Sequence, residues 1–513
     1  MNKFRILIAE DESNWQDQLL KKALSLDAEV EIAATYEGAS QIIKEQYLDL
    51  ALIDLSLPSG KLNIPASQSP LLGINLLGDI RKQGPRNQHI GVVVISGMVD
   101  VLLTDKLKGE FDVFKVIDKA EGLPDNFLNI LQSAILAGWL DRSDFLNTSR
   151  CRLTVSFSKD YLLSSELQGA DRIVTSTSEN PQRIDVNDLV RRADILNWMI
   201  SNGGTDIWRP EAKSIGKAIY ETITAHRHVL SNLTAARAIM KSSNDVWLEF
   251  TGPAIALGVP FELMRDEQDE PLALYHIMTR QIAGKSRKAE PFHEFIRNLL
   301  KKQERLNILI VGANSDNRIP AAEAEAELLR ESIKKTLTSL GVDHDIKVLC
   351  GRDASYENIR QTLSTYECHI FHYAGHGRYD DKNPEKSGLV LRDGNSIRIL
   401  AATELDDLVR NKNLRLVYLS SCTSARTADR AGQGDFYSIF DALAKADVPV
   451  VIGFRWAVAD APAMEFAKTF YDELWRTFSP GEALMKARKN AANGPLGRDD
   501  DTWLSPILMM HST

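Results

Sequence analysis

The chain has 513 residues, of which 44% are apolar and 26% charged, with four cysteines and a formal net charge of −9. This length exceeds what one hydrophobic core usually organises, so roughly two to four domains are expected. The modest charge gives no general electrostatic reason to bind nucleic acid or anionic lipid, and the composition argues against wholesale disorder. No uninterrupted apolar stretch is long enough to span a bilayer, so no membrane anchor is expected.

The cysteines occur without Cys-x-x-Cys spacing, at Cys151, Cys350, Cys368 and Cys422. This pattern argues against a disulfide framework and against a structural zinc site. The first ten residues hold one short apolar run that ends at Glu10, which is unlike an export signal. A cytoplasmic location is therefore expected.

The first 140 residues alternate short apolar runs with helical patterns in five β/α units. Apolar strands separated by helices predict a parallel sheet covered on both faces, with functional loops at the carboxyl ends of the strands. The expected elements are strands at Arg5–Ala9, Val30–Ala34, Leu48–Ile53, Gly91–Ile95 and Val113–Ile117, and a closing helix at Phe127–Leu140.

Charged and polar side chains follow several of these strands. Glu10 and Asp11 come directly after the first strand, and Asp54 comes directly after the third. Three carboxylates at one edge of a sheet need a cation, and Mg²⁺ prefers such oxygen ligands. Ser96 ends the fourth strand and Lys119 follows the fifth, which adds a hydroxyl and an ammonium group to the same edge.

The segments IAEDES, LIDLSLP, VVVISG and VIDKAEG resemble the receiver domain of two-component response regulators. The resemblance implies a flavodoxin-like, five-stranded parallel fold. It makes Asp54 the phosphoacceptor and a ligand of Mg²⁺, together with Glu10, Asp11 and the carbonyl of Ser56.

The same resemblance gives Ser96 and Lys119 contacts with the phosphoryl oxygens, and it implies a sensor histidine kinase as partner. Phosphorylation would pull both side chains inward and change the contacts of the receiver or its homodimerisation. This sequence departs from the family in a longer loop at Ser59–Pro70 and in Val116, where receivers often have an aromatic residue. The alternative is a degenerate receiver that only docks or dimerises.

Beyond the receiver, the predicted domains are a linker and middle region at 141–305 and a final domain at 306–513. Ser, Thr and alternating apolar residues mark the linker, and helical periodicity dominates Val186–Lys241. A second α/β alternation begins at Leu306. Its expected strands are Leu306–Gly312, Asp345–Leu349, His369–Tyr373, Leu389–Arg392, Arg415–Ser420 and Val448–Phe454.

A histidine and a cysteine follow two strands of this second alternation. His376 lies in HYAGHG and Cys422 lies in VYLSSCTS. Glycines around His376 predict a tight turn that projects the imidazole over the edge of the sheet. An adjacent imidazole can form the thiolate nucleophile and can then protonate a leaving amine. The backbone N–H groups of Gly377 and Cys422 are the expected oxyanion donors.

This pair resembles the CHAT family of caspase-like cysteine peptidases, whose pattern is His-Gly after one strand and Ser-Cys after another. VPFELM, NILIVGAN and VVIGFRWAVADAPA look like further landmarks of that family. The resemblance implies a caspase-like α/β fold with an inactive N-terminal half and a catalytic C-terminal half, and a His376–Cys422 dyad that needs no cofactor. Because side chains alternate along a strand, a metal cluster of Cys368, His369 and His372 with His376 is not expected, and core packing is the expected role of His372 and Cys368.

The function expected from both resemblances is an endopeptidase that cleaves a protein substrate under control of receiver phosphorylation. Each site residue also has an ordinary structural alternative, because a lone histidine or cysteine more often packs than reacts. A non-enzymatic signalling adaptor, in which both domains bind partners, therefore stays open. A transcription regulator is not supported, because no helix-turn-helix with a basic recognition face stands out.

Overall fold

The structure is a computed structural model, and the chain divides into two compact units: Met1–Asn147, His293–Arg305 and Leu337–Asp343 in the first, and the remaining segments in the second. Each unit is described by itself. No helix among the described residues is long and apolar enough to cross a membrane. The described residues are 3–60, 71–82, 87–147, 151–168, 173–176, 184–202, 205–239, 246–282, 290–317, 319–378, 386–410, 412–422, 439, 442–443, 446–456, 458–495, 497–499 and 502–511.

The first unit contains a five-stranded parallel sheet in the order β2-β1-β3-β4-β5. This order is flavodoxin-like, so the predicted fold is confirmed. Strand β4 is buried along its whole length, as expected for a parallel strand covered on both faces. The bounds are β1 Phe4–Ala9, α1 Ser13–Leu24, β2 Ala28–Ala33, α2 Tyr36–Glu45, β3 Leu50–Ile53, α3 Leu72–Lys82, β4 Gly91–Ser96, α5 Val101–Phe111, β5 Lys115–Asp118, η2 Lys119–Glu121 and α6 Phe127–Asn147.

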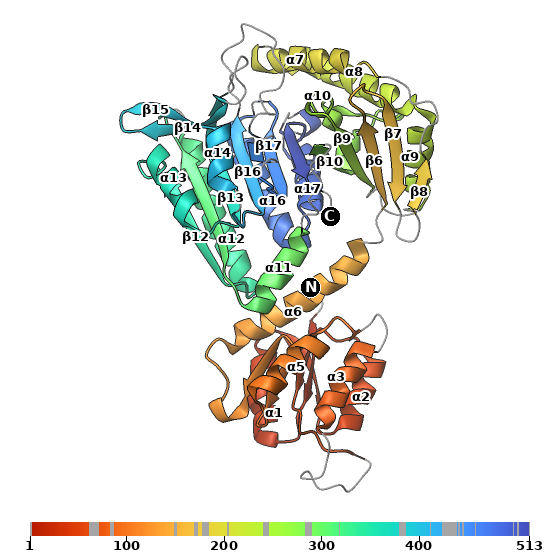
Figure 1. Ribbon diagram of the computed structural model, residues 1–513, viewed down its shortest axis with the longest axis vertical. Coiled ribbons are helices and arrows are strands. Elements are labelled where there is room, and N and C mark those ends of the chain that lie inside the picture. The colour runs from red at the N-terminus through yellow and green to blue at the C-terminus, as the bar shows by residue number, and fades with distance from the viewer. Residues whose placement is uncertain are drawn as a thin grey trace. The chain divides into compact units, whose positions relative to one another are not determined.

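The second unit is built on one 13-stranded sheet, in which β12, β11, β13, β16 and β17 are parallel neighbours (Figure 1). Strand β18 joins them antiparallel to β17 and leads to β10, β9 and β6 of the middle region. The mixed α/β architecture that was predicted after the receiver is therefore present.

The bounds in the middle region are β6 Arg152–Phe157, β7 Leu163–Gln168, β8 Ile173–Ser176, α7 Val186–Asn202, α8 Thr205–Thr224, α9 Arg227–Ile239, β9 Trp247–Gly252, α10 Ala254–Leu257, η3 Phe261–Leu263, η4 Leu272–Leu274 and β10 Ile277–Ile282. Helix α11 is Phe292–Lys302. The bounds in the final region are β11 Leu306–Ala313, α12 Pro320–Ser339, β12 His344–Cys350, α13 Tyr356–Thr365, β13 Ile370–Arg378, β14 Gly388–Asp393, β15 Ser396–Ala401, α14 Ala402–Val409, β16 Leu416–Cys422, β17 Val450–Phe454, α16 Asp460–Thr477, α17 Pro480–Ala492, η6 Gly497–Asp499 and β18 Pro506–Met510.

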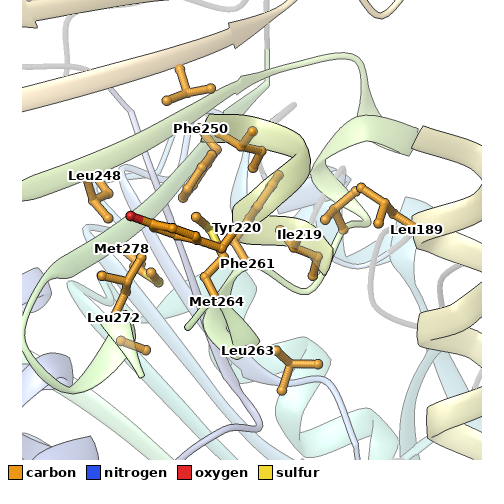
Figure 2. Close-up of a cluster of buried hydrophobic side chains, with 14 of the residues drawn as sticks. Leu189, Ile219, Tyr220, Leu248, Phe250, Phe261, Leu263, Met264, Leu272 and Met278 are labelled. Carbon is orange, nitrogen blue, oxygen red and sulfur yellow. The ribbon is translucent and has the colours of Figure 1, made fainter. Parts of the chain in front are cut away.

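An apolar core fixes the VPFELM segment of the middle region against its strands. Figure 2 shows Phe250 of β9 and Phe261 of VPFELM packed face to face, and their ring centroids are 3.8 Å apart with an angle of 3° between the planes. Both rings are buried, and each buried ring of this size contributes about 1.5–3 kcal/mol. This packing gives the VPFELM segment a structural role in the core of the second unit.

A buried ion cluster lies next to this core. Glu262 accepts a hydrogen bond from Nη2 of Arg280 at 2.7 Å, and Nη2 of Arg488 lies 3.8 Å from Glu262. Burial alone would raise the pKa of Glu262, but the two guanidinium groups hold it below its usual range. Because Arg280 is on β10 and Arg488 is on α17, the cluster ties the middle region to the final region.

Candidate functional site

The two predicted catalytic residues lie opposite each other on neighbouring strands. The parallel register of β13 and β16 pairs His376 with Cys422. Neighbouring strands are about 4.8 Å apart, so these two backbones are adjacent at the carboxyl edge of the sheet. The description covers the backbone of Cys422 but not its side chain. The sheet therefore brings together two positions that lie in separate motifs of the sequence.

Strand β13 is longer than predicted, because it runs through the HYAGHG motif to Arg378. The predicted tight turn at the glycines was wrong. A Cβ on Gly375 would lie 2.6 Å from the hydroxyl oxygen of Tyr373 and 2.9 Å from the carbonyl oxygen of Ala313. Glycine therefore permits a close approach of chains inside the sheet, and Gly377 then pairs with Leu389 of β14.

The hydroxyl group of Tyr373 holds the backbone at His376. Its oxygen lies 2.8 Å from the carbonyl oxygen of His376 and 3.0 Å from that of Val390, so its proton is shared between two acceptors. Burial raises the pKa of Tyr373, which keeps the hydroxyl protonated as a donor. The main chain that carries the imidazole is thus held in place.

Asp316 gives the imidazole of His376 an acidic partner. Oδ1 of Asp316 lies 3.4 Å from Nε2 of His376, and each side chain is 23% exposed. Asp316 was not predicted, because it lies in a loop without periodicity. The signal that was available is its place three residues after β11, at the same edge of the parallel sheet as the two predicted residues.

A buried polar network lies on the strands that carry the candidate dyad. Nε2 of His372, on β13, lies 3.1 Å from Oε1 of Glu325, and Ser420, on β16, donates to Oε2 of the same carboxylate at 3.1 Å. Nδ1 of His372 lies 3.3 Å from the hydroxyl oxygen of Tyr471. All four side chains are buried. The network joins α12, β13, β16 and α16.

In the first unit, Lys119 lies among carboxylates at the predicted edge of the sheet. Its Nζ is 2.8 Å from Asp54, 2.9 Å from Glu10 and 3.1 Å from Glu12. Burial alone would lower the pKa of Lys119, but the hydrogen bonds to Asp54 and Glu10 outweigh burial and raise it. The ammonium group therefore occupies the centre of the acidic edge.

The carboxylates at this edge fit a divalent cation. Carboxylate oxygens of Glu10, Glu12 and Asp54 lie within 4.8 Å of one another, and Oε2 of Glu10 is buried without a hydrogen-bond partner. Burial raises the pKa of Glu10, as expected for a carboxyl group that lacks a full set of donors. Glu12 was not predicted. Asp11 is exposed and is not in the cluster, although burial and the nearby charge of Asp54 raise its pKa.

The other predicted receiver residues lie along the same edge. Ser96 ends β4, is fully buried and pairs in register with Asp118 of β5. The backbone N–H of Ser56 donates to Oδ1 of Asp54 at 3.0 Å. The Ser56 carbonyl as a metal ligand, and Ser96 as a phosphoryl contact, stay predictions. Residues 61–70 of the long loop lie outside the described residues.

The family of the second unit follows from a comparison with known domains. The model of the CHAT domain matches residues 213–510, which is more than half of the chain. The chain belongs to the CHAT domain family. CHAT domains form a caspase-like peptidase family, and in this CHAT protein the match includes both His376 and Cys422.

Solved receiver domains are similar to the N-terminal region of this CHAT protein. A CheY-like receiver domain protein from Methanospirillum hungatei is 24% identical, covers 23% of this chain and 82% of its own, and has a TM-score of 0.19. The HemR receiver domain from Leptospira biflexa is 25% identical over 26% and 94% of the two chains, with a TM-score of 0.21. A magnesium-bound receiver domain from Pseudomonas aeruginosa is 21% identical over 26% and 98%, with a TM-score of 0.19. No curated protein matches the chain.

The three other thiols of this CHAT protein are poor nucleophiles. Burial raises the pKa of Cys368 to about 12 and that of Cys350 to about 11, and it also raises the pKa of Cys151. Because the thiolate is the reactive form, these three cysteines should react slowly near neutral pH. A thiol-directed probe can therefore distinguish Cys422 from the rest.

Proposed function

We propose that this CHAT protein is a cysteine endopeptidase whose activity is controlled by phosphorylation of its receiver domain. The observation that carries the proposal is the register of β13 and β16, which sets His376 opposite Cys422. The Asp316 carboxylate, 3.4 Å from Nε2 of His376, supports it. In this proposal Asp316 orients the imidazole of His376, and the imidazole takes the proton of the thiol.

The chemistry begins when His376 takes the proton of Cys422. The thiolate attacks the carbonyl carbon of a peptide bond, and the backbone N–H groups of Gly377 and Cys422 stabilise the resulting oxyanion. His376 then protonates the leaving amine, and water hydrolyses the thioester and regenerates the thiol. Asp316 stabilises the imidazolium form of His376 between these steps. A reducing cytoplasm would keep Cys422 available as a thiol.

Control begins at Asp54, whose carboxylate would accept a phosphoryl group from a sensor histidine kinase. Mg²⁺, held by Asp54, Glu10 and either Asp11 or Glu12 with the Ser56 carbonyl, would neutralise charge on the phosphoryl oxygens. Lys119 already contacts Asp54 and can move to the phosphoryl group. Ser96 would supply the second contact.

The dyad is tested by labelling the full chain with a thiol-reactive peptide electrophile and locating the label by mass spectrometry. We expect label on Cys422 in the wild type, far slower labelling in His376→Ala, and no label at that position in Cys422→Ala. The exposed His228, on α9, provides the matched control His228→Ala, which should label like the wild type.

Two outcomes separate the enzyme from the adaptor. If Cys422 stays unlabelled with and without a phosphoryl mimic, the chain is a non-enzymatic adaptor. If it is labelled, new N-termini in a proteome treated with wild-type protein, and absent with Cys422→Ala, identify the substrate. Regulation is tested by labelling rates with and without beryllofluoride and Mg²⁺, and equal rates would exclude it.

A further inference from the structure

Two segments far from the N-terminus belong to the same compact unit as the receiver. They are His293–Arg305, which contains most of α11, and Leu337–Asp343, which contains the end of α12 and the turn to β12. Their contacts are with β5, α6 and the residues between α5 and β5. Because these contacts lie inside one compact unit, the two segments pack on the receiver as part of that unit.

Helix α11 is held to the receiver by charged side chains on one flank. Lys301 Nζ lies 2.7 Å from Asp112 and 3.6 Å from Asp141, and Arg297 lies 2.7 Å from Asp141. Asp112 has a left-handed backbone with φ 48°, and Arg81 donates to its carbonyl oxygen at 3.0 Å. Arg297 and Asp141 are 18% and 14% exposed, so solvent screens this pair only partly.

The second segment approaches α6 closely at Gly341, which has no side chain of its own. Ser133, on α6, donates to the carbonyl oxygen of Gly341 at 2.6 Å. A Cβ on Gly341 would lie 2.7 Å from Cβ of Gln132 and 2.9 Å from the carbonyl oxygen of Asn129, and φ at Gly341 is 71°. Only glycine permits this turn and this distance together. We call the two segments with their receiver contacts the receiver dock.

Both segments of the receiver dock continue into strands of the sheet that carries the candidate dyad. Leu306 begins β11 and pairs with His344, which begins β12. At its other end β11 pairs Ala313 with Gly375, the residue before His376. Asp316 lies three residues after Ala313, the last residue of β11. A shift in the segment before β11 therefore has a short covalent path to the acidic partner of His376.

The receiver dock also has a short path to the phosphoacceptor. Lys115 begins β5, and Lys119 directly follows the last residue of the same strand. Lys115 donates to Oε1 of Gln303, directly after α11, at 3.0 Å. Lys119 donates to Asp54 at 2.8 Å. A change at Asp54 that moves Lys119 thus acts on a strand whose other end contacts the dock.

We infer that phosphorylation of Asp54 is communicated to the candidate dyad through the receiver dock, with α11 and β11 as the moving element and the Asp316–His376 pair as its target. The inference deepens the proposed function and rests on it for the meaning of the dyad. The partner surface of the receiver is then a segment of this same chain.

The test is hydrogen exchange of the full chain with Mg²⁺, with and without beryllofluoride. We expect the mimic to change exchange in peptides covering 293–305 and 337–343, and also in 306–317. Asp54→Asn should show none of these changes. A change confined to the receiver residues up to 147, or no change anywhere, would overturn the inference.

Charge variants locate the path. Lys301→Glu should lose the response at 306–317, whereas Lys302→Glu, at the exposed neighbouring position, should keep it. Asp112→Asn is a milder second variant, because asparagine tolerates the left-handed backbone of Asp112, and it should also lose the response. If Lys301→Glu and Asp112→Asn both fold and respond like the wild type, the dock does not transmit the signal.

Labelling of Cys422 distinguishes the failure of this inference from the failure of the proposed function. If labelling of Cys422 responds to beryllofluoride equally in the wild type and in Lys301→Glu, the peptidase proposal is supported and transmission through the receiver dock is excluded. If hydrogen exchange changes in a way that depends on Lys301 but Cys422 never reacts, the receiver dock transmits a conformational change and the peptidase proposal is excluded.

Discussion

Oδ1 of Asp316 lies 3.4 Å from Nε2 of His376, so the imidazole has a carboxylate partner. Losing a polar contact of this kind costs roughly 1–2 kcal/mol, here in the orientation of the imidazole. Asp316→Asn should therefore slow labelling of Cys422 about tenfold.

The control for Asp316→Asn is Asp353→Asn, which makes the same change at an exposed position of the same region. Asp316→Glu should recover part of the rate, since it restores the charge. An orienting role is distinguished from a structural one by thermal unfolding, which should be nearly unchanged in Asp316→Asn. A normal labelling rate in that variant would show that His376 needs no acidic partner.

The ligand set for Mg²⁺ is a second prediction, because the carboxylates that cluster are Glu10, Glu12 and Asp54. Removing one carboxylate ligand should weaken binding at least about tenfold, or ~1.4 kcal/mol. The ring of Trp15 lies 5.6 Å from Nζ of Lys119, so its fluorescence should report a cation that displaces Lys119. Trp15→Phe should remove that signal.

The two variants to compare in this titration are Glu12→Gln and Asp11→Asn. We expect Glu12→Gln to weaken Mg²⁺ binding if the cluster is the ligand set. Should Asp11→Asn alone weaken it, the sequence-based set of Glu10, Asp11, Asp54 and Ser56 is correct, and the cation reorganises this loop on binding.

The pH dependence of the receiver is a third prediction. Burial raises the pKa of Glu10 above 4.5, so the folded chain takes up this proton at a higher pH than the unfolded chain does. The contribution of Glu10 to the free energy of unfolding is therefore present below pH 4.5 and is lost as pH rises through the folded pKa. Mg²⁺ binds the ionised carboxylate, so stabilisation by Mg²⁺ should grow over the same interval.

The measurement is the denaturation midpoint of the receiver transition from pH 4.5 to about neutrality, with and without Mg²⁺. In Glu10→Gln the pH dependence in this range should be smaller, and Mg²⁺ should have little effect. If Mg²⁺ raised the denaturation midpoint of the wild type equally at both ends of this pH range, Glu10 would not be the titrating ligand.

Features that depend on local sequence patterns could be predicted, whereas contacts between residues far apart in the sequence could not. Apolar runs predicted the strands, and the geometry of parallel sheets then placed His376 and Cys422 on one edge. Glu12 and Asp316 were missed because they lie in loops, where spacing does not indicate direction. The receiver dock was missed because Lys301 and Asp112 are 189 residues apart, and an ion pair at that separation leaves no periodic pattern.

A last prediction concerns the buried network below the candidate dyad. Glu325→Ala would leave His372 and Ser420, both buried, without their carboxylate partner. Ser420 loses a buried hydrogen bond and His372 loses a close carboxylate contact, so at roughly 1–3 kcal/mol each we expect a loss of about 3 kcal/mol in the unfolding transition of the second unit. Glu357→Gln, which breaks an exposed pair with Arg360, should change the free energy of unfolding by less than about 1 kcal/mol.

Because the network joins the two strands that carry His376 and Cys422, Glu325→Ala should also slow labelling of Cys422 below the unfolding temperature. Equal stability of Glu325→Ala and Glu357→Gln in thermal and denaturant unfolding would show that the network is not needed to hold β13 against β16.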